Sequence, residues 1–290
     1  MRRVAIIGLG LIGGSMGLAL KKAQVKDLEL VGFARRPEVA SMSLSIGAVD
    51  RAEGDLISAV KDADLVLIAT PAMAVREVLT QIGGSLPQGC IVTDTASTKA
   101  QVMAWAQELL PPSVAFIGGH PMAGKETFGI EAADADLFRG CVYCLIPGEN
   151  ASTEATNLVT ELVKQIGANL LFLDALEHDS MVAAVSHLPL LLSAALVSTT
   201  MKSPAWPQMA RLAATGFRDL TRLASGNPKM SGDICLTNKE PILRWIDEFI
   251  TELGEFRRLV SEEDKELEQT FLGAREQRER WLQQMERGRA

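Results

Sequence analysis

The sequence predicts an α/β protein with an N-terminal Rossmann-type domain, built on a mostly parallel sheet, and an all-helical C-terminal dimerisation domain. Two observations predict this class. In the first 173 residues, short apolar runs alternate with amphipathic stretches, as strands and their covering helices do in a parallel sheet. After about Asp174 the chain becomes a series of long helical segments, the first of which is apolar and lacks glycine. We therefore expect domains at residues 1–172 and 173–290.

Composition narrows the class of protein. Hydrophobic residues make up 47% and charged residues 22%, which is ordinary for a globular chain with a large core. The net charge of −7 argues against nucleic acid as a partner. Four cysteines and no signal peptide favour the reducing cytoplasm, and the N-terminal apolar run is too short and too interrupted to span a membrane.

Seven strands are expected, several of them continuous apolar runs typical of strands buried on both faces. Their ranges are Val4–Gly8, Leu28–Phe33, Leu65–Ala69, Ile91–Asp94, Val114–Gly118, Val142–Ile146 and Leu170–Leu173. The helices expected between them are Leu11–Lys22, Pro37–Ser45, Met73–Gly83, Thr98–Leu110 and Thr153–Gly167. The second domain is expected to hold the long helix after Asp174 and helices at Trp206–Leu223, Pro241–Leu259 and Glu262–Arg289. An apolar stripe on the last helix either docks it on the protein or forms a dimer.

The stretch "VAIIGLGLIGGSM" predicts a dinucleotide site. Gly8 permits a tight turn, Gly10 lets the backbone approach a pyrophosphate, and Gly13 lets the following helix pack against the strand. The free N–H groups at the start of that helix then face the phosphates. We expect cofactor contacts from this turn and from the ends of neighbouring strands: Gly8, Leu9, Gly10, Leu11, Ile12, Gly13, Arg35, Arg36, Thr70, Pro71 and Thr95.

The end of the second strand favours NADP over NAD. An NAD site usually places an acidic residue there to bind the ribose 2′-hydroxyl. Here the chain reads "VGFARRP", with Arg35 and Arg36 in place of a carboxylate. Paired guanidinium groups suit a 2′-phosphate, although two solvated surface charges would look the same in the sequence. We therefore expect NADP as the preferred cofactor, with NAD possible.

His120 is the strongest candidate for a catalytic base. It lies in "FIGGHPMAGKE", just past the end of a predicted strand, where open α/β sheets bind ligands. Nearby glycines, among them Gly124, leave room for a substrate, and histidine titrates near neutral pH. "DTASTK" follows the preceding strand and offers the hydroxyls of Thr95, Ser97 and Thr98.

The other two histidines predict less. His178 is flanked by acidic residues and is expected to be exposed, whereas His187 lies among apolar residues and is expected to be a core residue. Nine residues of regular helix would place them on opposite faces, so they predict no metal pair. Pro189 is expected to perturb the helix just after His187. The CxxC pair formed by Cys141 and Cys144 lies on a predicted strand and is expected to be structural, so no metal site is predicted.

Two arginines stand four residues apart in "TGFRDLTRLASGNP". On one helix, Arg218 and Arg222 would share a face and could bind carboxylates bidentately. A solvated helix carrying the same two arginines is an equally good interpretation of this segment alone.

Five motifs, in this order, resemble those of the prephenate and arogenate dehydrogenases of tyrosine biosynthesis: "GLGLIGGS", "DTASTK", "GGHPMAG", "SHLPLLLSAAL" and "GFRDLTRLASGNP". The resemblance covers nearly the whole chain. It implies a homodimer formed through the helical domain. It also implies oxidative decarboxylation of a cyclohexadienyl substrate, prephenate or arogenate, with hydride transfer to NAD(P)⁺.

The resemblance also implies site residues. By motif, His120 would accept the proton of the substrate's 4-hydroxyl, and Ser97 would hydrogen-bond the same hydroxyl beside the nicotinamide. Arg222 would bind a substrate carboxylate with Arg218 in support, and His187 would line the pocket. Glu126 stands where some family members carry a glutamate that contacts the substrate.

Two other functions remain as alternatives. A two-domain dehydrogenase of the 3-hydroxy acid or imine type would rely on a catalytic lysine in the helical half, and no lysine there lies on an evident apolar, glycine-lined face. A non-catalytic NADP sensor would need the nucleotide site but not His120, Ser97 and Arg222 together.

Overall fold

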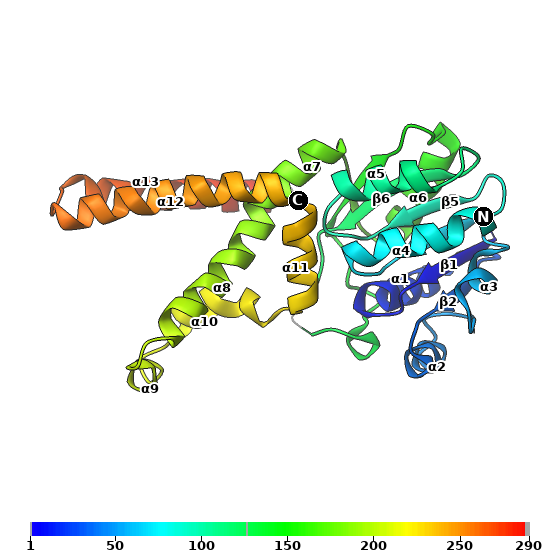
Figure 1. The fold of residues 1–290 in the computed structure, drawn as a ribbon, viewed down its shortest axis with the longest axis horizontal. Helices are drawn as coiled ribbons and strands as arrows, with labels where there is room; N and C mark the ends of the chain where they lie inside the picture. The colour runs from blue at the N-terminus through cyan, green and yellow to red at the C-terminus, as the bar shows by residue number, and fades with distance from the viewer. Residues whose placement is uncertain (1, 126, 288–290) are drawn as a thin grey trace. The chain divides into compact units, whose positions relative to one another are not determined.

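An eight-stranded sheet forms the centre of the first of two compact units, Met1–Ile242 (Figure 1). The structure is a computed structural model that describes residues 2–125 and 127–287. The strand order is β3-β2-β1-β4-β5-β6-β7-β8, and only the β6–β7 pair is antiparallel. The strands are β1 Arg3–Ile7, β2 Glu29–Phe33, β3 Arg51–Ala52, β4 Leu65–Ile68, β5 Ile91–Asp94, β6 Ala115–Pro121, β7 Val142–Pro147 and β8 Asn169–Phe172.

Helices cover both faces of this sheet, which explains why its strands read as apolar runs. Successive residues of β1 alternate between two core clusters: Val4 and Ile6 belong to one, Ala5 and Ile7 to the other. The helices of the sheet domain are α1 Leu11–Lys22, α2 Pro37–Ser45, α3 Leu56–Val60, α4 Ala72–Ile82, α5 Ala100–Leu109 and α6 Thr153–Gln165. The first cluster includes residues of α1 and α6, and the second includes residues of α3, α4 and α5.

The chain then continues through helices that remain in the first unit. These are α7 Ala175–Val182, α8 Leu188–Met201, α9 Trp206–Met209, α10 Thr215–Thr221 and α11 Pro228–Thr237. A π-helical segment, Ala183–His187, joins α7 to α8. The Asp174 carboxylate caps α7 by accepting hydrogen bonds from the N–H groups of Leu176 and Glu177, at 2.9 and 2.8 Å.

The second compact unit, Leu243–Ala290, contains most of α12 Lys239–Ser261 and all of α13 Glu266–Arg287. The two helices form a hairpin in which the rings of Phe256 and Phe271 lie 5.5 Å apart. Asp264 caps α13 through the N–H of Glu266 and also pairs with Arg258 of α12.

The structure confirms the predicted fold class. Individual elements differ from the prediction: two short ones and one capped helix were missed, and one expected helix is divided. Strand β3 and helix α3 were not expected, because two and five residues are too short to show a period. The expected helix Trp206–Leu223 is divided into α9, α10 and a 3₁₀ turn at Arg222–Ser225. Helix α11 was missed although Asn227 caps it and Pro228 begins it, the usual signals of a helix N-terminus.

Strand order reverses direction between β1 and β4. From β1 the chain runs outward through β2 and β3, then returns to β4 on the other side of β1 and continues to β5 and β6. The carboxyl ends of β1 and β4 therefore border the crevice where open α/β sheets bind ligands. The glycine turn, Thr70 and Pro71 all follow these two strand ends.

Candidate functional site

The three glycines after β1 meet three different geometric needs. Gly8 has a φ of +98°, a backbone angle that residues other than glycine rarely adopt. A Cβ on Gly13 would lie 1.9 Å from the Gly8 carbonyl oxygen, so the start of α1 packs tightly against the turn. Gly10 is the N-cap of α1, and an added Cβ there would meet nothing within 4 Å. The turn thus leaves open space beside the first N–H groups of α1, those of Leu11 and Ile12.

The ends of β4 and β5 lie beside this turn. The backbone N–H of Thr95 donates to the carbonyl of Ile68 at 3.0 Å, and Pro71 is the N-cap of α4. Thr70 Oγ1 is buried and has no hydrogen-bond partner among the residues that the structure describes. A buried hydroxyl without a partner is costly, and a ribose or nicotinamide group bound at this crevice would satisfy it. The predicted cofactor residues therefore fit a dinucleotide.

Arg35 and Arg36 come directly after β2 at the same edge of the sheet. Both side chains are exposed, and the backbone of Arg36 forms the N-cap of α2. The side chain of Leu9, another predicted cofactor residue, is buried. A contact between these guanidinium groups and a 2′-phosphate stays a prediction.

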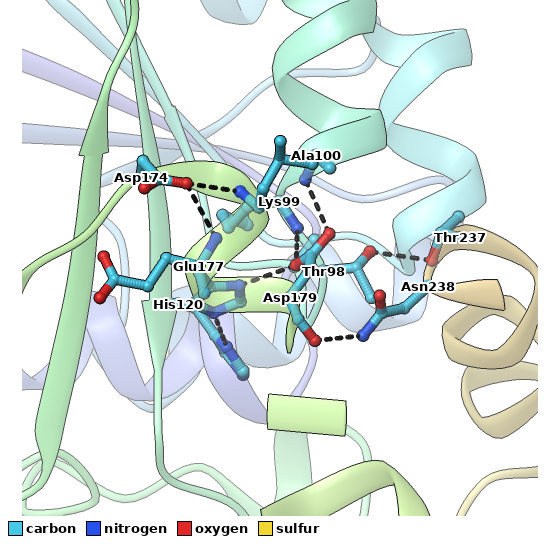
Figure 2. Close-up of polar contacts among 12 residues, drawn as sticks. Thr98, Lys99, Ala100, His120, Asp174, Glu177, Asp179, Thr237 and Asn238 are labelled. Carbon is cyan, nitrogen blue, oxygen red and sulfur yellow. Dashed lines mark hydrogen bonds and ion pairs between the residues drawn. The ribbon is translucent and has the colours of Figure 1, made fainter. Parts of the chain in front are cut away.

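A carboxylate and two imidazole rings form one hydrogen-bonded chain beneath the carboxyl ends of β5 and β6 (Figure 2). Asp179 Oδ1 lies 2.8 Å from His178 Nδ1, and His178 Nε2 lies 2.8 Å from His120 Nδ1. All three residues are buried. The prediction that His178 is exposed was wrong: its ring packs edge-on against His120 of β6, a contact that the helix sequence does not reveal.

Asp179 is itself held by the start of α5. Its Oδ1 accepts a hydrogen bond from the backbone N–H of Lys99 at 2.7 Å, and its Oδ2 accepts one from Ala100 at 2.8 Å. These are orphan donors of a helix N-terminus, where negative charge is also favoured by the helix dipole. Both carboxylate oxygens of Asp179 therefore act as acceptors toward α5, and Oδ1 also accepts the hydrogen bond of His178.

The order of donors in this chain determines the tautomer of each ring. Because Asp179 accepts, His178 carries its proton on Nδ1 and presents a lone pair at Nε2. His120 must then donate from Nδ1, which leaves the lone pair of a neutral ring on its Nε2. Among the described residues, His120 Nε2 has no protein partner. The arrangement produces a base whose free nitrogen is ready to accept a proton.

The surroundings keep His120 neutral. Burial lowers its pKa well below 6.5, and positive charge on His178, Lys99 or His187 would lower it further. Lys99 lies fully buried between β5 and β6, where its Nζ pairs with Asp94 and donates to the Gly119 carbonyl at 2.7 Å. This ion pair ties the two strand ends together directly before His120.

His187 lies in the same buried cluster as the two other histidines. The π-helical segment that ends at His187 contains one residue more per turn than an α-helix. It reduces the rotation between His178 and His187 from half a turn to roughly a quarter turn, so the prediction of opposite faces was wrong. Pro189 cannot donate a helical hydrogen bond, which accounts for the widened turn before it and confirms the predicted perturbation.

Ser97 and Gly124 take no part in the hydrogen bonds of the histidine cluster. Ser97 is partly exposed after β5, and its hydroxyl has no hydrogen bond among the described residues. Gly124 is exposed in the loop after β6, where a Cβ would meet nothing within 4 Å. Glu126, predicted as a substrate contact, lies outside the described residues.

Arg218 and Arg222 do not share one α-helix. Helix α10 ends at Thr221, and Arg222 begins the 3₁₀ turn Arg222–Ser225. This turn is held against α8 because Ser193 Oγ accepts the N–H of Ala224 at 2.9 Å. Both arginine side chains are exposed. Arg222 keeps helical backbone angles as the C-cap of α10, and the shared face inferred from the spacing stays a prediction.

The sequence did not identify Lys99, His178 or Asp179 as parts of the site. A His-Asp dipeptide in the first helix after the sheet domain was a usable signal, because adjacent residues can form this hydrogen bond on one helix. No local signal connected that dipeptide to His120, which is 58 residues away.

Comparison with known proteins identifies relatives over most of the chain. The family model "Prephenate dehydrogenase, nucleotide-binding domain" matches residues 16–172, and "Prephenate dehydrogenase, dimerization domain" matches residues 174–273. A prephenate dehydrogenase of Bacillus subtilis is 38% identical over 265 residues, 91% of this chain and 71% of its own length. A cyclohexadienyl dehydrogenase of Zymomonas mobilis is 32% identical over 266 residues, 91% of this chain and 90% of its own length.

A solved structure shows the same fold. The prephenate dehydrogenase of A. aeolicus, in complex with hydroxyphenyl propionate and NAD⁺, aligns with a TM-score of 0.89 and 28% identity, over 97% of this chain and 98% of its own. Sequence and structure comparisons thus agree on one family. They favour it over the 3-hydroxy acid and imine dehydrogenases and over a non-catalytic NADP sensor.

Two glycine variants test the cofactor turn. Gly10→Ala should leave the unfolding temperature unchanged, because the added Cβ meets nothing and the backbone is extended, but it should weaken dinucleotide binding by roughly tenfold or more. Gly13→Ala serves as the contrast, because its Cβ would overlap the Gly8 carbonyl and should lower the unfolding temperature. Calorimetric titration with the dinucleotide and thermal melts measure both. Full cofactor affinity in a stable Gly10→Ala protein would contradict a pyrophosphate at this turn.

His187 makes stability depend on pH. Burial lowers its pKa from 6.5 to about 4, so between these values the unfolded chain binds a proton that the folded chain does not. The free energy of unfolding should therefore fall as pH falls from 6.5 to 4, by about 3 kcal/mol from this residue. Urea unfolding of the wild type and of His187→Gln at several pH values tests this. The variant should lose stability less steeply, and equal slopes would show that His187 is not a buried neutral ring.

Proposed function

Because the chain belongs to the prephenate dehydrogenase family and is an NAD(P)-dependent dehydrogenase, we propose that His120 is the base in its oxidation of a cyclohexadienyl substrate. The observation that supports this proposal is the chain from Asp179 through His178 to His120. These hydrogen bonds give His120 a fixed orientation and a lone pair on Nε2, while burial lowers the pKa of the ring. A positioned base of this kind accounts for a large part of the rate of a proton-coupled step.

The proposed reaction uses a cyclohexadiene ring with a carboxylate on C1 and a hydroxyl on C4. A bound nicotinamide would supply the acceptor for the hydride from C4. His120 Nε2 takes up the hydroxyl proton as the C4–H bond breaks, which places negative charge on the oxygen and assists the loss of hydride. The carboxylate leaves C1 as CO₂, its electron pair makes the ring aromatic, and the phenol oxygen recovers its proton.

The rest of the proposed site orients the substrate. Ser97 hydrogen-bonds the 4-hydroxyl, Arg222 binds a carboxylate, and Arg218 supports the segment that carries Arg222. Gly124, from the loop after β6, and Glu126 contact the substrate side chain. Prephenate and arogenate share the ring and differ in this side chain, so either one fits the chemistry assigned to His120.

We also propose that NADP is the preferred cofactor. The support is the pair of exposed guanidinium groups of Arg35 and Arg36 directly after β2, where a ribose 2′-phosphate would lie.

The proposed assembly is a cytoplasmic homodimer formed through the helical domain, residues 173–290. One support is the match of residues 174–273 to a family model of a dimerization domain. The other is the long apolar helical stretch Ala175–Met201, whose most apolar 18 residues are only 22% buried within this chain. By length and composition alone this stretch could also cross a membrane. Exposed apolar residues such as Leu176 and Val185 suit burial against a second copy, because a dimer interface removes apolar surface from water as a membrane would.

Replacing the base tests the main proposal. His120→Asn should lower kcat by about 10²–10⁴-fold with prephenate or arogenate while changing KM little, because a general base acts mainly in the transition state. Asp179→Asn preserves the shape of the side chain but removes the charge that orients His178 and, through it, His120. This variant should lower kcat by a smaller factor. Formation of reduced nicotinamide measures both. Unchanged turnover in a folded His120→Asn protein would contradict the assignment.

Cofactor preference has its own test. The wild type should show a higher kcat/KM with NADP⁺ than with NAD⁺, and Arg35→Ala with Arg36→Ala should remove most of that preference by raising KM for NADP⁺ about tenfold or more. Arg139→Ala, another exposed arginine, is the control and should leave the ratio unchanged. A wild type that prefers NAD⁺ would refute the proposal.

A further inference from the structure

The His187 ring carries a buried nitrogen that the fold does not satisfy. The residue is 1% exposed, and its Nε2 has no hydrogen-bond partner among the described residues. Its other nitrogen, Nδ1, lies 3.1 Å from the side-chain nitrogen of Asn238. Asn238 is also buried and stands between the end of α11 and the start of α12.

The contacts of Asn238 determine which way its amide points. Its Nδ2 lies 2.8 Å from the backbone carbonyl oxygen of Asp179, and Figure 2 shows the side chain directed at that residue. A carbonyl oxygen can only accept, so the atom facing it must be the amide nitrogen. The same nitrogen faces His187 with its second hydrogen. His187 Nδ1 must therefore be an acceptor.

This geometry leaves one protonation state for His187. A neutral ring with a lone pair on Nδ1 carries its proton on Nε2. Burial, which lowers the pKa of His187 to about 4, keeps the ring neutral at physiological pH. The unsatisfied atom is consequently an N–H donor, and it belongs to the histidine cluster that includes His120. Such a donor calls for an acceptor oxygen that this chain's described residues do not supply.

We propose that Asn238 is a positioning residue that holds His187 as a neutral Nε2–H donor for an acceptor oxygen of the substrate side chain, a keto or carboxylate oxygen. This inference rests on the proposed function, because it takes the histidine cluster to be the substrate site. The same amide also anchors the carbonyl of Asp179 and so joins the donor His187 to the residue that fixes His120. Two opposite tautomers are thereby maintained side by side, a proton acceptor at His120 and a proton donor at His187.

Nitrogen-15 NMR of the imidazole rings measures the tautomer of His187 directly. The chain has only three histidines, so the signal that disappears in His187→Gln is that of His187. In the full-length wild type at neutral pH, His187 should be protonated on Nε2 and unprotonated on Nδ1. In Asn238→Asp, where a carboxylate oxygen replaces the donor, Nδ1 should become protonated. Thr237→Val is the matched control, since it removes the neighbouring buried contact to Thr98 without touching His187, and the tautomer should persist.

Ligand binding and kinetics test the role in recognition. Adding hydroxyphenyl propionate should shift the His187 Nε2 resonance, and Asn238→Ala should raise KM about tenfold, the effect of one lost hydrogen bond, with a smaller change in kcat. A His187 that carries its proton on Nδ1 in the wild type, an unchanged tautomer in Asn238→Asp or an unshifted Nε2 with the ligand bound would each overturn the proposal. Absence of wild-type activity with both substrates would instead overturn the proposed function, while leaving the tautomer measurement to decide the role of Asn238 in the fold.

Discussion

The buried carboxylate of Asp179 is the contact on which the site depends. It accepts hydrogen bonds from two N–H groups at the start of α5 and from the ring of His178, and its own backbone carbonyl is bound by Asn238. An isolated buried charge is expensive, and these donors together with the helix dipole stabilise it. The carboxylate thereby attaches the first helix after the sheet to the sheet edge and fixes the proton positions of two histidines.

The architecture explains why this contact lies where it does. Parallel strands bring the carboxyl ends of β5 and β6 to one edge, where Lys99 and Asp94 join them and where His120 lies near the end of β6. The glycine turn after β1 lies at the same edge of the sheet, at the reversal of strand order. One layer of strand ends thus carries both the proposed dinucleotide site and the proposed base, His120. Positioning of this kind is what a strongly favourable oxidation and decarboxylation requires from a protein.

The sequence was sufficient for features that depend on local pattern. The glycine turn and the buried strands follow from φ requirements, close packing and hydrophobic period, so both appear in the structure close to where they were expected. His178 was misjudged because its acidic neighbours suggested solvent, whereas its partner is on a strand 58 residues earlier in the chain. The relation of His178 to His187 was misjudged because regular helix geometry cannot anticipate a π-helical turn. The roles of the site residues remain predictions, that of His120 and those of the cofactor residues included.

The central claim is that Asp179, through His178, fixes the tautomer of the His120 ring and leaves its lone pair on Nε2. Nitrogen-15 NMR of the His120 ring in the wild type and in Asp179→Asn tests it most directly. The account predicts a wild-type His120 protonated on Nδ1 and unprotonated on Nε2 at neutral pH, and a mixture of tautomers once the carboxylate is replaced. A wild-type His120 protonated on Nε2, or a tautomer indifferent to Asp179, would contradict it.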